Sequence, residues 1–167
     1  MIEADSAKAP PKALPMGATI GILGGGQLGR MLALAAARLG FKCHIYAPEA
    51  DSPAFDVAQH HTCAAYDDVA ALEAFAAQVD VITYEFENVP AQTASVLSAR
   101  KPVLPDPKVL ETSQDRLAEK SFIARLGIAT ARFAPVSSMD ELRQALAQIG
   151  LPAVLKTRRM GYDGKGQ

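Results

Sequence analysis

A glycine-rich turn constrains the fold of this chain more than any other feature. Residues 18–30 read ATIGILGGGQLGR, so a short β-rich apolar run meets three consecutive glycines and then an Ala/Leu-rich helical pattern. Gly24, Gly26 and Gly29 have the G-x-G-x-x-G spacing, which allows a tight turn, a closely approaching phosphate and close helix–strand packing. The N–H groups and positive dipole end of the following helix favour an anion. The pattern predicts a nucleotide or phosphate site; a purely structural strand-to-helix turn is the alternative.

Strands alternate with helices through the first two thirds of the chain. We predict strands at residues 19–23, 42–46 and 79–86, an extended piece near 61–64 and a brief strand at 103–104. The intervening pattern predicts helices at 27–39 and 53–57, one from the Asp67-Asp68 cap to about 78, and one at 90–100. This alternation indicates an α/β fold with a parallel, Rossmann-like sheet.

The pattern changes after Pro105-Asp106-Pro107. We predict a short helix at 107–112, a longer helix at 114–126 capped by Ser113, and a helix that a capping box at 138–141 opens. Two further strands are predicted at 131–136 and 153–157. The domains are therefore expected to be a loose tail (1–16), a Rossmann-like domain (17–112) and the beginning of an α+β domain (113–167). Because the last predicted strand lacks a partner strand, we expect this chain to be the N-terminal part of a longer protein.

The last twelve residues combine four cations with three glycines. Such a loop can fold N–H and cationic groups over a polyphosphate, although it lacks the spacing of a Walker A loop. An exposed basic tail is the alternative. The cations are Lys156, Arg158, Arg159 and Lys165.

Carboxylates at the end of the predicted strand 79–86 form a second candidate site. Thr83, Glu85 and Glu87 alternate onto one side of a regular strand, and ligands of open parallel sheets bind beyond the carboxyl ends of strands. A carboxylate there accepts hydrogen bonds from ribose hydroxyls or an amino group; a solvated carboxylate before Pro90 is the alternative.

Other polar groups give weaker signals. Arg116 and Lys120 are four positions apart and share a helical face. Asp115 and Glu119 can neutralise their charges, so a solvated helix surface is expected there from spacing alone. The neighbouring His60-His61 have no third ligand at useful spacing, so surface histidines are expected and no metal site is predicted.

Composition excludes some classes of function. The formal net charge of −1 recruits neither nucleic acid nor an anionic membrane, and no run is apolar and long enough to span a bilayer. Cys43 and Cys63 lack zinc-ligand or C-x-x-C spacing, so reduced core thiols and a cytoplasmic location are expected.

Four sequence blocks occur in an order that matches one known family. They are Gly24–Met31 (GGGQLGRM), Glu85–Val89 (EFENV), Gln114–Leu117 (QDRL, with Lys120) and Lys156–Gln167, the last being the most specific. The chain from about Thr19 onward resembles the N-terminal part of the 5-(carboxyamino)imidazole ribonucleotide synthase family, ATP-grasp ligases of purine biosynthesis. The resemblance implies a pre-ATP-grasp domain followed by the start of an ATP-grasp domain.

The resemblance also implies a reaction. ATP phosphorylates bicarbonate to carboxyphosphate, and the exocyclic amine of aminoimidazole ribonucleotide is then carboxylated, with ADP and phosphate as products. Mg²⁺ bridges the phosphates. The family's magnesium-binding carboxylates and adenine-binding linker have no counterpart here, so no catalytic or metal-binding residue is implied in this chain. We expect the chain alone to be inactive and the whole enzyme to be a homodimer.

Site residues follow from the matching blocks. The implied substrate-binding residues are Gly26, Gln27, Leu28 and Glu85, with Tyr162 at the edge of the substrate. The implied ATP-binding residues include Lys156, on the α-phosphate side, and a mobile loop over the β- and γ-phosphates; they are Arg116, Lys156, Gly161, Tyr162, Asp163, Gly164, Lys165, Gly166 and Gln167. Met160 stands where many family members have glycine, which stiffens the loop.

Three alternatives stay open. A dinucleotide-binding domain needs an acidic residue at the end of its second strand, and Glu49 lies beyond Ala47-Pro48, past that end. A non-catalytic nucleotide-binding or scaffold module and another ATP-grasp ligase, such as a formate-using relative, are the others. Under the preferred interpretation, the glycine-rich turn and the C-terminal loop face each other.

Overall fold

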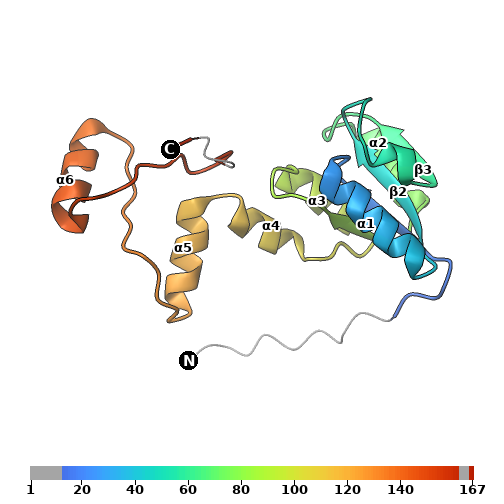
Figure 1. Cartoon of the computed structure of the whole chain (residues 1–167), viewed down its shortest axis with the longest axis horizontal. Helices are drawn as coiled ribbons and strands as arrows, with labels where there is room; N and C mark the ends of the chain where they lie inside the picture. The colour runs from blue at the N-terminus through green and yellow to red at the C-terminus, as the bar shows by residue number, and fades with distance from the viewer. Residues whose placement is uncertain (1–12, 162–165) are drawn as a thin grey trace.

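The N-terminal part of the chain is built on a four-stranded parallel sheet (Figure 1). The computed structural model describes residues 13–161 and 166–167; most of the predicted N-terminal tail lies outside them. The strand order is β3-β2-β1-β4, which confirms the predicted Rossmann-like sheet. The strands are β1 (Thr19–Leu23), β2 (Lys42–Ala47), β3 (His60–Cys63) and β4 (Val81–Tyr84).

Helices connect and cover these strands, except for the last two, which stand apart from the sheet. In chain order they are α1 (Gln27–Arg38), the 3-10 turn η1 (Phe55–Val57), α2 (Val69–Ala77), α3 (Ala91–Ser98), α4 (Pro107–Ser113), α5 (Arg116–Arg125) and α6 (Met139–Ile149). The predicted strand at 103–104 is reduced to a single parallel bridge between Val103 and Ile82. Asp68 caps α2 as predicted, because its carboxylate accepts the Ala71 N–H at 3.0 Å.

Alternating side chains of the central strands build two cores. Ile22 and Ile45 pack with α1 and η1 on one face of the sheet, whereas Leu23 and Tyr46 pack with α2 and α3 on the other. Gly21 lies on the second face, where an added Cβ would come within 2.6 Å of the Phe75 ring. Side chains that alternate between the two faces of the sheet, and a glycine packed against Phe75, fix the sheet between its helices. This packing sets the position of the carboxyl ends of the strands.

Two predicted boundaries are wrong for local reasons. The strand 79–86 is shorter, because Val79 closes the end of α2 and the chain leaves the sheet after Tyr84. Ser113 does not cap α5; it ends α4, and its hydroxyl donates to the Leu110 carbonyl at 3.1 Å. Asp115 is the cap instead, since its carboxylate accepts the N–H groups at the start of α5 at 2.9 and 3.2 Å.

The segments predicted as strands at 131–136 and 153–157 are not strands in the structure. A strand needs a neighbouring strand to pair with its N–H and C=O groups. Among residues 13–161 and 166–167, neither of these two segments pairs with another strand. Helices α5 and α6 stand apart from the sheet, and the C-terminal segment runs from α6 back to the start of α5 (Figure 1). Ser138 caps α6 as predicted, accepting the Glu141 N–H at 3.2 Å.

Two smaller expectations concern thiols and membranes. Cys43 is a buried free thiol as expected, but Cys63 lies exposed on the edge strand β3 and is not a core residue. Among the helices in the described part of the chain, none combines the length and apolarity needed to cross a bilayer.

Candidate functional site

The glycine-rich turn holds a carboxylate of the chain itself. Glu85 follows β4, the neighbour of β1, and its Oε1 and Oε2 accept the N–H groups of Gly26 at 3.1 Å and Gly29 at 3.0 Å. Gly24 has φ +110°, and a Cβ there would lie 2.2 Å from Glu85 Cγ. The turn therefore requires glycine, and the anion favoured by the start of α1 is the Glu85 carboxylate.

The predicted alternation of Thr83, Glu85 and Glu87 does not survive, because β4 ends at Tyr84. Glu85 turns toward the glycines, whereas Glu87 is exposed in the turn that follows. Gln27 and Leu28 begin α1 beside Glu85, and both side chains are exposed. The predicted substrate residues Gly26, Gln27, Leu28 and Glu85 thus gather at one edge of the sheet.

Residues 114–116 hold the start of the C-terminal loop. The backbone N–H of Arg116 donates to the Arg158 carbonyl at 2.9 Å, and the Arg116 guanidinium donates to the Gly161 carbonyl. Asp115 accepts the Arg158 guanidinium at 3.1 and 2.5 Å, and this hydrogen bond lowers the pKa of the Asp115 carboxyl. Two of the predicted ATP-binding residues, Arg116 and Gly161, are therefore in direct contact.

Gln114 connects this contact to the substrate side. Its side chain donates to the carbonyls of Glu87 and Val89 and accepts from Arg159. A cavity of about 310 Å³ adjoins it, lined by Glu87, Ser113, Gln114, Arg116, Glu119, Arg158, Met160 and Gly161. The cavity thus places Glu87, two positions after Glu85, beside Arg116 and Gly161 of the predicted nucleotide side.

The rest of the predicted ATP loop is described only in part. Lys156 is exposed in a segment without regular secondary structure, and Gln167 is exposed too. The Gly166 carbonyl accepts the Thr157 N–H at 2.7 Å. The predicted residues Tyr162, Asp163, Gly164 and Lys165 lie outside the described residues.

Met160 has φ +58°, a left-handed conformation that costs a non-glycine residue about 1 kcal/mol or more. The backbone at this position is therefore one that glycine adopts more easily.

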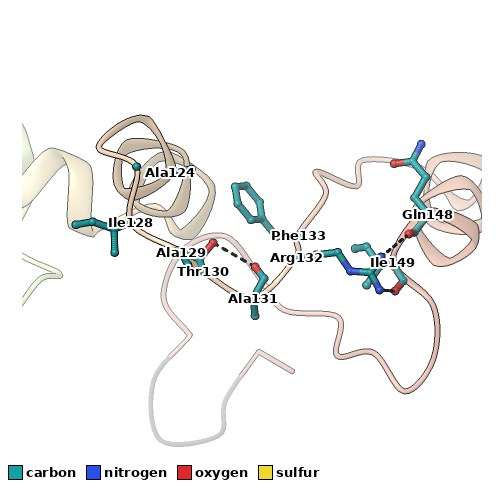
Figure 2. Close-up of a pocket in the computed structure, with 10 residues that line it drawn as sticks. Ala124, Ile128, Ala129, Thr130, Ala131, Arg132, Phe133, Gln148 and Ile149 are labelled. Atoms are coloured by element: carbon teal, nitrogen blue, oxygen red, sulfur yellow. Dashed lines mark hydrogen bonds between the residues drawn. The ribbon is translucent and has the colours of Figure 1, made fainter. Parts of the chain in front are cut away.

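Arg116 and Lys120 do not share a solvated patch. Arg116 points to the C-terminal loop, whereas Lys120 Nζ donates to the Ala131 carbonyl at 3.1 Å and lies 5.1 Å from the Phe133 ring centroid. A second cavity, of about 570 Å³, lies on this far side between α5, residues 127–133 and α6. Figure 2 shows the side chain of Arg132, one of the lining residues, reaching the carbonyls of Gln148 and Ile149. This larger cavity contains none of the predicted site residues.

The histidines lie away from the site. His60 and His61 are exposed on β3, and the His61 ring stacks on Phe55 at 4.3 Å. Within residues 13–161 and 166–167, no cluster of three potential ligands could hold a metal ion. His44 is buried against Phe75, and its Nε2 lies 2.8 Å from Thr62 Oγ1.

Sequence reasoning assigned no site role to Gln114 or Asp115, and it named Arg159 only as one of the cations of the C-terminal loop. Asp115 carried a signal, because Asp is a preferred N-cap residue. Gln114 carried none: a glutamine becomes a buried bridge only through partners 25 to 45 positions away.

Comparison with known proteins shows the family of the chain. The model of the ribonucleotide synthetase preATP-grasp domain matches residues 17–114. The chain belongs to this family. An ATP-grasp domain model matches residues 121–167, so the preATP-grasp domain is followed by the beginning of an ATP-grasp domain.

Several relatives of this preATP-grasp chain share one name. It is 54% identical over 154 residues to the N5-carboxyaminoimidazole ribonucleotide synthase of Brucella melitensis, covering 92% of this chain and 42% of that protein. The crystal structure of the Staphylococcus aureus N5-carboxyaminoimidazole synthetase complexed with ADP has a TM-score of 0.88 at 40% identity, with 92% of this chain and 41% of that chain covered.

A structure with lower sequence identity is named as a complex with a nucleotide and a ribonucleotide. The Aspergillus clavatus N5-carboxyaminoimidazole synthase, in complex with ADP and 5-aminoimidazole ribonucleotide, has a TM-score of 0.77 at 28% identity; the match covers 90% of this chain and 39% of that chain. The chain thus spans about two fifths of the length of these relatives.

Proposed function

We propose that this chain supplies the substrate-binding domain and the first part of the nucleotide-binding domain of an ATP-grasp carbon–nitrogen ligase. In the proposed reaction a bicarbonate oxygen attacks the γ-phosphorus of ATP, giving carboxyphosphate and ADP. The exocyclic amine of aminoimidazole ribonucleotide then attacks the carboxyphosphate carbon, phosphate leaves, and the nitrogen loses a proton. The product is 5-(carboxyamino)imidazole ribonucleotide. The observation that carries the proposal is the cavity that Glu87, just after Glu85, shares with Arg116 and Gly161, together with the Gln114 hydrogen bonds to the Glu87 and Val89 carbonyls.

On the substrate side, Glu85 is the central residue. Two backbone N–H groups fix its carboxylate, which leaves remaining lone pairs for the ribose hydroxyls or the amine of aminoimidazole ribonucleotide. Gly26, Gln27 and Leu28 surround it at the start of α1, and we assign Tyr162 to the edge of the same site.

On the nucleotide side, Arg116 and Lys156 supply positive charge toward the phosphates of ATP. Gly161 begins the loop that closes over the β- and γ-phosphates, and residues 162–167 complete it. Mg²⁺, when bound, neutralises the phosphate oxygens; we assign its ligands and the adenine site to parts of the enzyme outside this chain.

We place the domain boundary between residues 112 and 113, and we expect the whole enzyme to be a cytoplasmic homodimer.

The occupied glycine-rich turn argues against a dinucleotide-binding domain. A dinucleotide pyrophosphate uses the N–H groups at the start of the first helix, and in this chain Gly26 and Gly29 already donate to Glu85. A phosphate placed there would also face a carboxylate of like charge.

A chimaera tests the proposal directly. Residues 1–167 are joined to the remaining part of the Brucella melitensis synthase, and phosphate release is measured. We expect release that requires ATP, bicarbonate and aminoimidazole ribonucleotide together, and none from the 167-residue chain alone. Glu85→Gln should reduce the release at low substrate concentration, whereas Glu111→Gln, at an exposed glutamate outside the cavity lining, serves as the matched control. Release that is independent of the ribonucleotide, with tight NAD binding by the chain, would refute the proposal.

A further inference from the structure

Gln114 lies where three parts of the chain meet. It follows α4, precedes the Asp115 cap of α5 and is 6% exposed, so its amide is out of solvent. A buried amide must satisfy both its donors and its acceptor within the protein.

The nitrogen end of this amide holds the turn that follows β4. Nε2 donates to the Glu87 carbonyl at 2.7 Å and to the Val89 carbonyl at 2.5 Å. Glu85, at the start of the same turn, is held by the N–H groups of Gly26 and Gly29. The turn 85–89 is therefore fixed at both ends.

The oxygen end holds the C-terminal loop. Oε1 accepts from Arg159 Nη2 at 2.8 Å, beside the contacts that Asp115 makes with Arg158 and Arg116 makes with Gly161. The amide orientation follows from these partners. Reversed, it would place two donors against a guanidinium and an acceptor against two carbonyl oxygens.

We propose that Gln114 is a positioning residue that ties the turn carrying Glu85 to the base of the loop carrying Gly161. One amide contacts both: its nitrogen end holds the turn, and its oxygen end holds Arg159 at the base of the loop. The proposal rests on the proposed function for its purpose, which is to keep substrate and nucleotide sides in register. Its test uses no ligand, so its failure is distinguishable from failure of the proposed function.

The test is residue-specific amide hydrogen exchange in the 167-residue chain, with two reporters. The Glu85 N–H, which donates to Leu23, reports on the turn, and the Arg116 N–H, which donates to Arg158, reports on the loop. Gln114→Met removes both sets of hydrogen bonds, so we expect both reporters to exchange about tenfold faster. The amides of Ile22 and Ile45, in the other core, should stay unchanged and show that the sheet remains folded.

Two further variants distinguish the effect of the nitrogen end of the Gln114 amide from the effect of its oxygen end. Gln114→Glu keeps the acceptor for Arg159 but places a carboxylate against two carbonyls, so the Glu85 reporter should exchange faster while the Arg116 reporter does not. Arg159→Met should give the opposite pattern. Equal effects of Gln114→Glu and Gln114→Met at both reporters, a parallel change at Ile22 and Ile45, or no change in any variant would overturn the proposal.

Discussion

The buried imidazole of His44 should make the stability of the chain fall as the solution becomes acidic. The side chain is 2% exposed and lies edge-on to Phe75 with ring centroids 4.9 Å apart. Nε2 pairs with Thr62 Oγ1, but Nδ1 has no hydrogen-bond partner among the described residues. Protonation would therefore create a buried charge with an unpaired N–H group.

Burial, with smaller contributions from His60 and His61, lowers the pKa of His44 from 6.5 to about 4. The unfolded chain takes up the proton near pH 6.5 and the folded chain only near pH 4, so the unfolded state binds more protons between these values. The contribution of the neutral His44 imidazole to the free energy of unfolding is fully present above pH 6.5 and is lost as the pH falls from 6.5 to about 4. Since one pKa unit corresponds to about 1.4 kcal/mol, the loss amounts to about 3 kcal/mol.

The assay is urea unfolding of the wild type and of His44→Leu at pH values from 7 down to 4. Carboxylates titrate in both proteins, so the informative quantity is the difference between their free energies of unfolding. We expect the wild type to lose about 3 kcal/mol more than His44→Leu across the window. His61→Gln, which removes an exposed imidazole, is the control and should keep most of the wild-type dependence. Parallel pH profiles for wild type and His44→Leu would refute the reasoning.

Three further predictions follow from local contacts. Gly21→Ala places a Cβ within 2.6 Å of the buried Phe75 ring and should lower the free energy of unfolding by about 1–3 kcal/mol, measured in urea; an unchanged midpoint would contradict this. Asp115→Ala removes the cap of α5 and should cost about 1 kcal/mol, whereas Asp115→Asn keeps the cap and loses only the pairing with Arg158; equal losses would contradict the capping role. Met160→Ile puts a β-branched residue at φ +58° and should speed trypsin cleavage after Arg158 several-fold, whereas Met160→Gly should not; equal cleavage rates would contradict the strain.

Patterns of neighbouring residues were enough to predict the first domain. The apolar strand segments, their alternation with helical patterns, the glycine-rich turn and the helix caps are local, so a parallel sheet with helices on both faces could be predicted before any contact was known. The candidate residues of the site could also be named, because their blocks resemble a known family.

Tertiary structure alone decided what these residues do to one another. The anion in the glycine-rich turn is Glu85, which arrives from 56 to 59 positions away because β1 and β4 are neighbours. Gln114 bridges two segments because its hydrogen-bond partners, 27 and 45 positions away, are brought to it by folding. Residues 131–136 form no strand because a strand also depends on a partner distant in sequence. Local sequence sets the preference of each segment, and partners brought together by folding determine which polar groups are satisfied and where the site lies.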